Sequence, residues 1–233
     1  MALPAMPDCC TVTLADVSQT LIPSARAQLL LSQSETLRAS TFSSPRRRWQ
    51  YVQCHALLRE LLSKHVDIAA DQIELCEGEY GKPALSGRAA ESGAKFNISH
   101  SGSLAVIAVG TGVDIGVDIE QIKPGRNILD IADHFFNPSE TQAIHAMHRS
   151  EQESAFYSCW CRKESFIKAT GMGLGMPLSR FIVNVEPEAA AELVWIDYQD
   201  WQTSQWQMHT LLTPSGYLGA LTLGTDSSSC TSP

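Results

Sequence analysis

The order of helical and strand-like patterns along the chain constrains its fold more than any single motif. Helical spacing of apolar residues predicts two helices at 24–41 and 46–65. Apolar–polar alternation and short apolar runs predict strands at 11–17, 72–76, 95–99, 104–109 and 115–120. We also predict a turn at Glu79–Pro83 and a tight hairpin connection at 100–102. Helices and strands therefore do not alternate one by one.

The second part of the chain also combines predicted helices with predicted strands, without an obvious sequence repeat. Predicted helices cover 127–135, the stretch from Asn137 to near Arg149, and 151–170, where Gly171 can end the helix. Predicted strands cover 181–186, 193–198, 206–212 and 217–223. This order indicates an α+β fold rather than a regular βαβ alternation. No linker rich in Pro, Gly or Ser intervenes, so we expect two halves, 1–111 and 112–224, packed as one body, with 225–233 as a disordered tail.

Composition excludes several classes of function. The chain has 233 residues, of which 17 are Lys or Arg and 25 are Asp or Glu, giving a net charge of -8. This acidity argues against binding to nucleic acid or an anionic membrane. No apolar run reaches the roughly 18–20 residues of a membrane helix, and residues 1–10 lack the basic and apolar blocks of a secretory signal. Seven Cys without zinc spacing indicate free thiols, so we expect a cytoplasmic protein.

An acidic strand is the first candidate site. In the segment 112–120, Asp118 and Glu120 share one face of the predicted strand, while Val117 and Ile119 point into the core. Two carboxylates on a rigid strand form half of a site for a hard cation such as Mg²⁺. A solvated strand end is an equal alternative on spacing alone. Asp114 has the same parity but lies near the turn, and we expect it to be solvated.

The helix predicted at 151–170 supplies the second candidate. Phe156, Trp160 and Ile167 form an apolar stripe, and Glu164 and Lys168 lie four residues apart at its edge. The simple interpretation is a surface ion pair between Glu164 and Lys168. The glycine-rich segment 171–175 follows this helix and does not open one, so it is not a phosphate-binding loop.

Five motifs in this order resemble those of the 4′-phosphopantetheinyl transferases. They are Tyr80-Gly-Lys-Pro83, Phe96-Asn-Ile-Ser-His-Ser-Gly102, Gly116-Val-Asp-Ile-Glu120, Trp160-Cys-Arg-Lys-Glu-Ser-Phe-Ile-Lys168 and Gly171-x-Gly-Leu174. Each motif alone is weak, but five in order are specific. The resemblance covers roughly 45–223, and the chain length is similar to that of the Sfp-type, two-half monomers.

The resemblance implies a pseudo-twofold α+β fold with the active site in the cleft between the halves. It implies transfer of the phosphopantetheine arm of coenzyme A to a serine of an apo acyl or peptidyl carrier protein, with release of 3′,5′-ADP. Asp118, Glu120 and Glu164 would hold Mg²⁺, or Mn²⁺ in its place, with the pyrophosphate of coenzyme A. Either Glu164 or a metal-bound water would take the serine proton, and Lys168 would contact a phosphate or the group in transfer.

The resemblance also assigns coenzyme A contacts. Ser99 and His100 match positions that contact its phosphates, Lys82 matches a basic residue near the adenine end, and Arg46 matches one that reaches the 3′-phosphate. These assignments make 1–111 the coenzyme A side and 112–224 the side of the metal-binding strand and catalytic helix. One departure is His55, which stands where members often carry an Arg. We interpret Glu140 as structural or as a support for the site.

The sequence leaves two alternative functions open besides phosphopantetheinyl transfer. A catalytically silent relative that binds coenzyme A or a carrier protein would have no chemical need for the carboxylates and Lys168. A Mg²⁺-dependent hydrolase of coenzyme A-like pyrophosphates could use the same carboxylates with water as nucleophile. The sequence does not reveal which carrier is served, although the segment 123–137 is a candidate for selectivity. Because carrier proteins are acidic too, we expect a docking patch that is locally basic or apolar.

Overall fold

The computed structural model describes residues 9–198 and 201–225, which we divide for description into an N-terminal half (9–111) and a C-terminal half (113–225). The N-terminal half runs β1 (Cys10–Asp16), α1 (Ser24–Leu30), α2 (Gln33–Ser40), α3 (Pro45–Val66), β2 (Glu74–Glu77), β3 (Pro83–Ser86), α4 (Gly87–Ala90), β4 (Ala94–Ser101) and β5 (Leu104–Thr111). The C-terminal half runs β6 (Val113–Gln121), α5 (Ile128–Phe135), α6 (Pro138–Ala146), α7 (Arg149–Thr170), β7 (Phe181–Val183), β8 (Leu193–Ile196), β9 (Trp206–Thr210) and β10 (Tyr217–Thr225). The α+β fold predicted from the sequence is confirmed.

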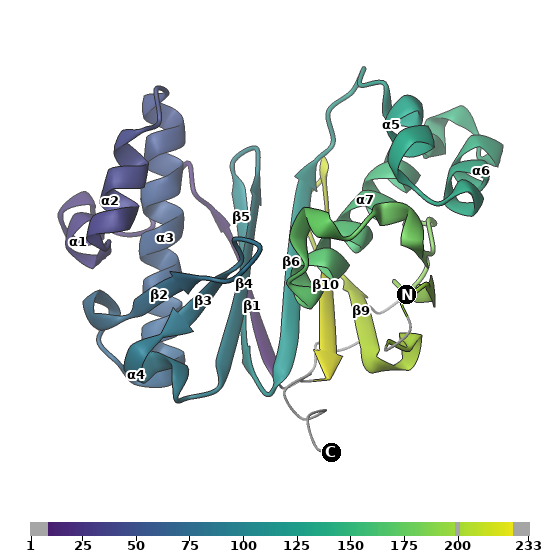
Figure 1. Ribbon diagram of the computed structural model, residues 1–233. Helices are drawn as coiled ribbons and strands as arrows, with labels where there is room; N and C mark the ends of the chain where they lie inside the picture. Colours follow the sequence, from purple (N-terminus) through teal and green to yellow (C-terminus); the bar gives the residue numbers. More distant parts are fainter. Residues whose placement is uncertain (1–8, 199–200, 226–233) are drawn as a thin grey trace, which may run out of the picture.

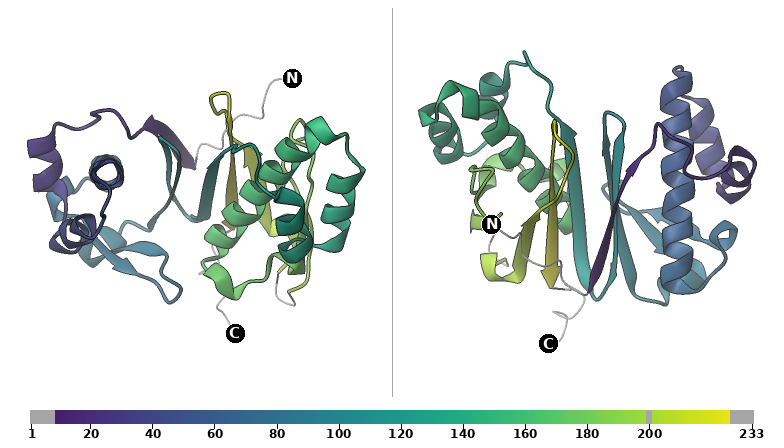
Figure 2. Two further views of the ribbon diagram at one scale, coloured as in Figure 1. Left: turned by 90° about the horizontal axis from the view of Figure 1, so that it is seen from above. Right: turned by 180° about the vertical axis from the view of Figure 1, so that it is seen from behind.

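Each half contains one three-stranded antiparallel sheet and one small hairpin sheet. The larger sheets have the strand orders β1-β5-β4 and β6-β10-β9, and the small ones pair β2 with β3 and β7 with β8. The two larger sheets lie together in the middle, with α1–α3 on one outer side and α5–α7 on the other (Figure 1). The view from above shows the same layers (Figure 2).

The halves meet through an apolar core between the two larger sheets. Leu104, Val106 and Ala108 of β5 pack against Val117 and Ile119 of β6. Both β6 side chains are fully buried, as the alternation of the strand predicts. The opposite face of β6, which carries the carboxylates, is therefore free to contact α7 of the C-terminal half.

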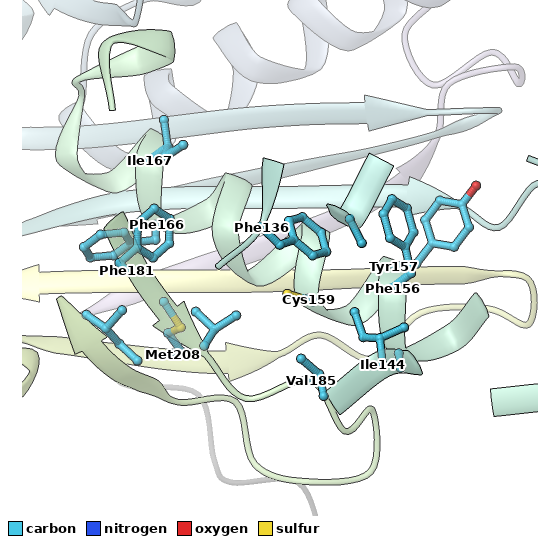
Figure 3. Packing of buried hydrophobic residues seen from close by; sticks show 14 of the residues in the cluster. Phe136, Ile144, Phe156, Tyr157, Cys159, Phe166, Ile167, Phe181, Val185 and Met208 are labelled. Carbon is cyan, nitrogen blue, oxygen red and sulfur yellow. The ribbon is translucent and has the colours of Figure 1, made fainter. Parts of the chain in front are cut away.

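Helix α7 covers that opposite face of β6 at short range. A Cβ added at Gly116 would overlap the carbonyl oxygen of Ser165 and the backbone nitrogen of Ala169, so only glycine allows this approach. The other side of α7 buries Phe156 and Phe166 against Phe181 and neighbouring apolar side chains (Figure 3). Gly171 ends the helix with a φ of 73°, as predicted. The position of α7 is thus fixed from both sides.

Two predicted elements differ from the structure. The segment 24–41 forms two helices, because Ser32 and Glu35 make a capping box that starts α2. The predicted connection at 100–102 is shorter, because β4 continues through His100 and Ser101. His100 consequently has a fixed strand geometry. The predicted tail lies outside the described residues beyond Thr225.

The remaining sequence expectations concern the surface and the thiols. All six cysteines in the described ranges are free. No helix in those ranges is long and apolar enough to cross a membrane. Asp114 is not a solvated strand end, because its Oδ1 lies 2.9 Å from the Lys95 ammonium of β4. This contact is one of several that join β4 to β6.

Candidate active site

Three carboxylates face one another across β6 and α7. Asp118 and Glu120 lie on β6, on the side that α7 covers, and Glu164 lies on α7 itself. Burial raises the pKa of Glu164, and the charges of Asp118 and Glu120 raise it further. Burial also raises the pKa of Glu120, with the Asp118 charge adding to the effect. Because these carboxylates repel one another when ionised, a cation bound among them would be stabilised.

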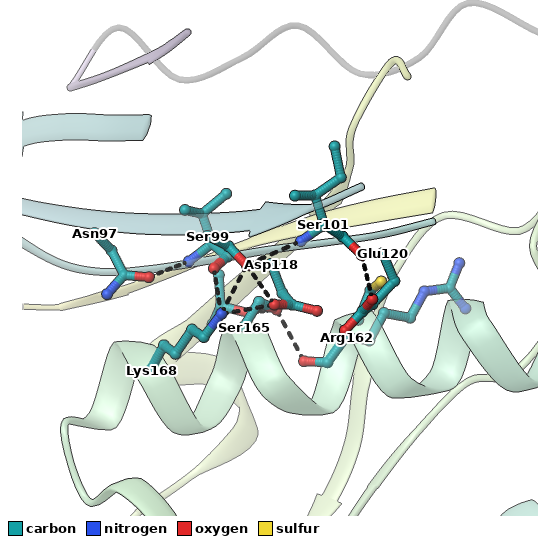
Figure 4. A network of polar contacts seen from close by, with 12 residues as sticks. Asn97, Ser99, Ser101, Asp118, Glu120, Arg162, Ser165 and Lys168 are labelled. Carbon is teal, nitrogen blue, oxygen red and sulfur yellow. Dashed lines mark hydrogen bonds and ion pairs between the residues drawn. The ribbon is translucent and has the colours of Figure 1, made fainter. Parts of the chain in front are cut away.

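Lys168 supplies a positive charge at this place. Its Nζ lies 2.6 Å from Asp118 Oδ1 and donates to Ser99 Oγ at 3.0 Å and to the Val117 carbonyl at 3.3 Å (Figure 4). The side chain is 27% exposed, so its ammonium can still meet a ligand. The predicted ion pair with Glu164 is replaced by this contact with Asp118, because β4 and β6 offer Lys168 three acceptors at once.

Two serines of β4 hold the strand carboxylates from the other half. The Ser99 hydroxyl donates to Asp118 Oδ1 at 2.8 Å, and the Ser101 hydroxyl donates to Glu120 Oε2 at 2.7 Å. Both serines are buried. Ser101 was not predicted as a site residue, although its place two residues after Ser99 on a strand puts both hydroxyls on one face.

A groove of three adjoining pockets runs past these side chains. The first pocket contains Glu164, Lys168 and Lys82 and ends at Gly173. The second shares Lys168 with the first and adds Ser99, His100, His55 and Arg38, and the third shares His100 with the second. The third pocket also contains Arg46, Arg47 and Lys123. An acidic protein thus has a groove lined by basic side chains.

Lys82 and His100 have their charges altered by burial. Burial lowers the pKa of Lys82 to about 8, and its Nζ donates to the Ile115 carbonyl at 2.9 Å and the Ala169 carbonyl at 3.4 Å. Lys82 therefore fastens the turn at 79–83 to β6 and α7 as well as lining the groove. Burial also lowers the pKa of His100, so its imidazole is uncharged at neutral pH. His100 then meets a ligand as a hydrogen-bonding group rather than as a cation.

His55 takes part in a buried cluster beside the second pocket. Its Nδ1 lies 3.0 Å from Glu35 Oε1, and its ring stacks on Tyr51 with centroids 4.0 Å apart. Arg59 contacts the same carboxylate through Nε at 2.8 Å. His55 is thus held by its own half and presents one edge to the groove.

Comparison with known proteins identifies the family of this site. Residues 114–222 match the 4′-phosphopantetheinyl transferase superfamily, and residues 23–111 match the family described as 4′-phosphopantetheinyl transferase, N-terminal. The chain is 34% identical to 4′-phosphopantetheinyl transferase Sfp of Bacillus subtilis (strain 168) over 70% of its length and 75% of that protein. The chain belongs to the 4′-phosphopantetheinyl transferases. Its likeness to 4′-phosphopantetheinyl transferase HetI of Nostoc sp. is 32% identity, over 70% of this chain and 68% of that protein.

The donor set of this phosphopantetheinyl transferase fits a hard divalent cation in its chemistry. Asp118 Oδ2 is buried without a hydrogen-bond partner among the described residues, and two further carboxylates lie nearby. Carboxylate oxygens are the ligands that Mg²⁺ prefers. Over the described ranges, however, no three His, Cys, Asp or Glu side chains are placed closely enough to hold a metal ion. Asp118 instead contacts the Lys168 ammonium, so the carboxylates would have to converge around a cation.

Proposed function

We propose that this transferase moves the 4′-phosphopantetheine arm of coenzyme A to a serine of an apo carrier protein and releases 3′,5′-ADP. The observation that carries the proposal is the groove itself, which is lined by basic side chains and by Glu164, whose pKa is raised by burial and by the charges of Asp118 and Glu120. Coenzyme A carries a pyrophosphate and a 3′-phosphate, which such side chains can bind. The carboxylates would be repulsive to this ligand without a cation.

The groove would hold the nucleotide end of coenzyme A, where one ribose carries both the adenine and the 3′-phosphate. We assign Arg46 in the third pocket to the 3′-phosphate, and Ser99 and His100 to phosphate contacts between the pockets. Lys82 lines the first pocket, at the end we assign to the adenine. The Lys82 ammonium already donates to two carbonyls, so it contributes charge to the pocket without needing to reach a phosphate directly.

Asp118, Glu120 and Glu164 would hold Mg²⁺, with Mn²⁺ as a substitute. A bound divalent cation supplies charge neutralisation for the pyrophosphate and for the departing 3′,5′-ADP. Asp118 contributes its unpartnered Oδ2 to this set. Lys168 would then turn its ammonium from Asp118 towards a phosphate oxygen, where it stabilises charge that grows during transfer.

Glu164 is the carboxylate best placed to handle the proton of the carrier serine. It lies on α7 and lines the first pocket next to Lys168. Burial and the neighbouring carboxylates raise its pKa, whereas a bound cation would lower it again. It would accept the serine proton directly or through one water, and the β4 contacts of Asp118 and Glu120 leave those two carboxylates less free to do so.

The carrier protein would dock beside the third pocket. Lys123 lines that pocket, Arg126 follows it on the surface, and Phe135 at the end of α5 is 47% exposed. This combination of basic and apolar groups suits the acidic surface of a carrier protein around its serine. We also propose that the transferase works as a monomer, since both walls of the groove come from one chain. The free cysteines of the described residues favour the reducing cytoplasm as its location.

The decisive experiment measures the intact mass of an apo carrier protein after incubation with coenzyme A, Mg²⁺ and the transferase. A mass gain of one phosphopantetheine arm is expected. Cleavage of coenzyme A without carrier modification would indicate the hydrolase, and neither product would indicate a silent relative. A panel of acyl and peptidyl carriers, tested in the same way, would then define which carrier is served.

A further inference from the structure

The free edge of β6 is closed by side chains of β4 rather than by another strand. On its other edge β6 pairs with β10. Towards β4, the backbone N–H groups of Val117, Ile119 and Gln121 donate to three β4 side chains. The acceptors are Asn97 Oδ1 at 2.9 Å, Ser99 Oγ at 3.4 Å and Ser101 Oγ at 3.0 Å. We call these six residues the β4–β6 seam.

The three side chains of β4 match the three N–H groups of β6 because side chains and N–H groups both alternate in direction along a strand. Alternate side chains of β4 point to one side, and alternate N–H groups of β6 point to one edge. The bonds satisfy backbone donors that would otherwise be buried unpaired between the halves. They also set the register of β6 against β4, and therefore the place of each carboxylate relative to the opposite half.

The hydroxyls of Ser99 and Ser101 each donate to one carboxylate, Asp118 and Glu120 respectively, and Ser101 has the simpler set of contacts. It accepts from the Gln121 N–H and donates at 2.7 Å to Glu120 Oε2. A serine hydroxyl has a single proton, so accepting the N–H leaves that proton directed at Glu120. The Ser99 hydroxyl, in contrast, also accepts from Lys168, and Asn97 contacts no carboxylate in the seam.

We propose that Ser101 is a positioning residue that restrains Glu120, so that its carboxylate needs little reorganisation when the three carboxylates converge on a divalent cation. This inference rests on the proposed function, in which Glu120 is one of three cation ligands. Glu120 belongs to the C-terminal half and Ser101 to the N-terminal half. The second half therefore cannot present this carboxylate correctly by itself.

The energetic reason is the freedom of a glutamate side chain. Its several rotatable bonds allow the carboxylate many positions, and fixing them on cation binding costs conformational entropy. The Ser101 hydrogen bond fixes Glu120 before the cation arrives. Partners that orient ligands in this way typically change metal affinity by about 10–100-fold when they are removed.

A matched pair of substitutions separates this role from simple packing. Ser101→Thr and Ser101→Val have nearly the same shape, but only the Thr variant keeps a hydroxyl. Ser92→Ala serves as a control, because the Ser92 hydroxyl also makes one donated and one accepted bond, to Ala89 and from Ala94, away from the groove. The unfolding midpoint of each full-length variant is measured first, and binding is compared below the lowest midpoint.

The binding measurement uses Mn²⁺ alone, followed through the electron paramagnetic resonance signal of the free ion, without coenzyme A. We expect Ser101→Val to weaken Mn²⁺ binding by about 10–100-fold. Ser101→Thr should stay within about threefold of the wild type, because its hydroxyl keeps the bond. Ser92→Ala should leave Mn²⁺ affinity unchanged. In transfer assays, Ser101→Val should raise the half-saturating Mg²⁺ concentration, with the rate recovering at high Mg²⁺.

Three results would count against different parts of the scheme. Equal Mn²⁺ affinity in Ser101→Thr and Ser101→Val overturns the positioning role, whatever their stabilities. A wild-type protein that binds no Mn²⁺ overturns the cation site on which the proposed function and this inference both depend. A wild type that binds Mn²⁺ but modifies no carrier leaves Ser101 testable and removes only the transfer.

Discussion

In the N-terminal half, β1 leads through α1, α2 and α3 to a small hairpin and then to β4 and β5. In the C-terminal half, β6 leads through α5, α6 and α7 to a small hairpin and then to β9 and β10. The sheet orders β1-β5-β4 and β6-β10-β9 correspond strand by strand. The long helices α3 and α7 have the same length of 22 residues. The two halves are therefore one architecture used twice.

The correspondence extends to a buried ion pair in each half. In α2, Glu35 caps the helix and contacts Arg59 of α3, and in α6, Glu140 caps the helix and lies 2.7 Å from Lys163 of α7. Arg59 and Lys163 each lie fourteen residues after the first residue of their helices. Each also donates to two backbone carbonyls of the segment that follows its helix. Glu140 is thus structural, as interpreted from sequence.

The halves differ at the proposed site. Glu60 and Lys64 occupy the helix positions in α3 that Glu164 and Lys168 occupy in α7. Glu60 forms an ion pair with Arg26 of α1, away from the groove. The strand β1 has one carboxylate, Asp16 at its end, whereas β6 has Asp118 and Glu120 facing its helix. The proposed site thus arises where strand carboxylates face a helix carboxylate and a lysine, a combination that the N-terminal half lacks because the one carboxylate of β1 stands at its end.

Substitution of the two matched glutamates should give the largest contrast. Glu164→Ala should lower carrier modification by on the order of 10³-fold, because a cation ligand and proton acceptor is lost. Glu60→Ala should leave the rate within about twofold, since exposed ion pairs contribute little. Intact mass of the carrier over time measures both. Transfer at an unchanged rate in Glu164→Ala would sink the site assignment.

Removal of the matched buried cations should destabilise both halves alike. We expect Arg59→Met and Lys163→Met each to lower the free energy of unfolding by about 3–5 kcal/mol, because each removes the arginine or lysine charge beside a buried glutamate. Urea unfolding at pH 7 measures the loss. Replacing both partners of a pair by apolar residues should recover part of it. A loss under about 1 kcal/mol in one half only would break the equivalence of the pairs.

The stability that Glu35 contributes should depend on pH differently from the stability that Glu140 contributes. Burial would raise the pKa of Glu35, but bonds from His55 and the Ser32 N–H, together with the Arg59 charge, lower it to about 2. The ionised form therefore adds stability above the ordinary value near 4.5, about 3 kcal/mol in all, which disappears as the pH falls towards 2. The stability difference between wild type and Glu35→Gln, from urea unfolding at several pH values, should shrink over that range.

Glu140 provides the control for this pH dependence. Its pKa is raised by burial, which Lys163 and two backbone N–H groups only partly oppose. The folded state thus holds this proton more tightly than the unfolded chain, so the contribution of Glu140 to stability grows as the pH falls through the raised pKa. If the stability difference between wild type and Glu35→Gln stays constant down to pH 2.5, the lowered pKa of Glu35 is contradicted.

The smallest expected effect concerns the matched lysines. The Lys168 ammonium lies 2.6 Å from Asp118 and competes with any other cation there. Lys168→Met should therefore tighten Mn²⁺ binding in the absence of coenzyme A by about tenfold, because one positive charge leaves the site. Lys64→Met should have no effect. Isothermal titration gives both affinities, and weaker binding in Lys168→Met would mean that Lys168 supports Asp118 instead of competing.

Much of the fold followed from periodicity, and the exceptions have local causes. The bounds of α3, α7 and β6 were predicted within a few residues, because each carries a long apolar pattern. The single helix predicted at 24–41 was wrong, since apolar spacing continued through a capping box that restarts the helix at Ser32. The residues Asp118, Glu120, Glu164 and Lys168 were found through motif order, and their roles stay predictions.

The sequence alone determined which faces are apolar, which segments carry carboxylates and to which family the chain belongs. These properties depend on local spacing and residue type. Only the tertiary structure decided that Lys168 meets Asp118, that Lys95 meets Asp114 and that Ser101 meets Glu120. The last two pairs join the halves, and spacing within a strand specifies a face but not what packs against it. The site exists because two similar halves place the edge of β6 beside β4, which no local pattern encodes.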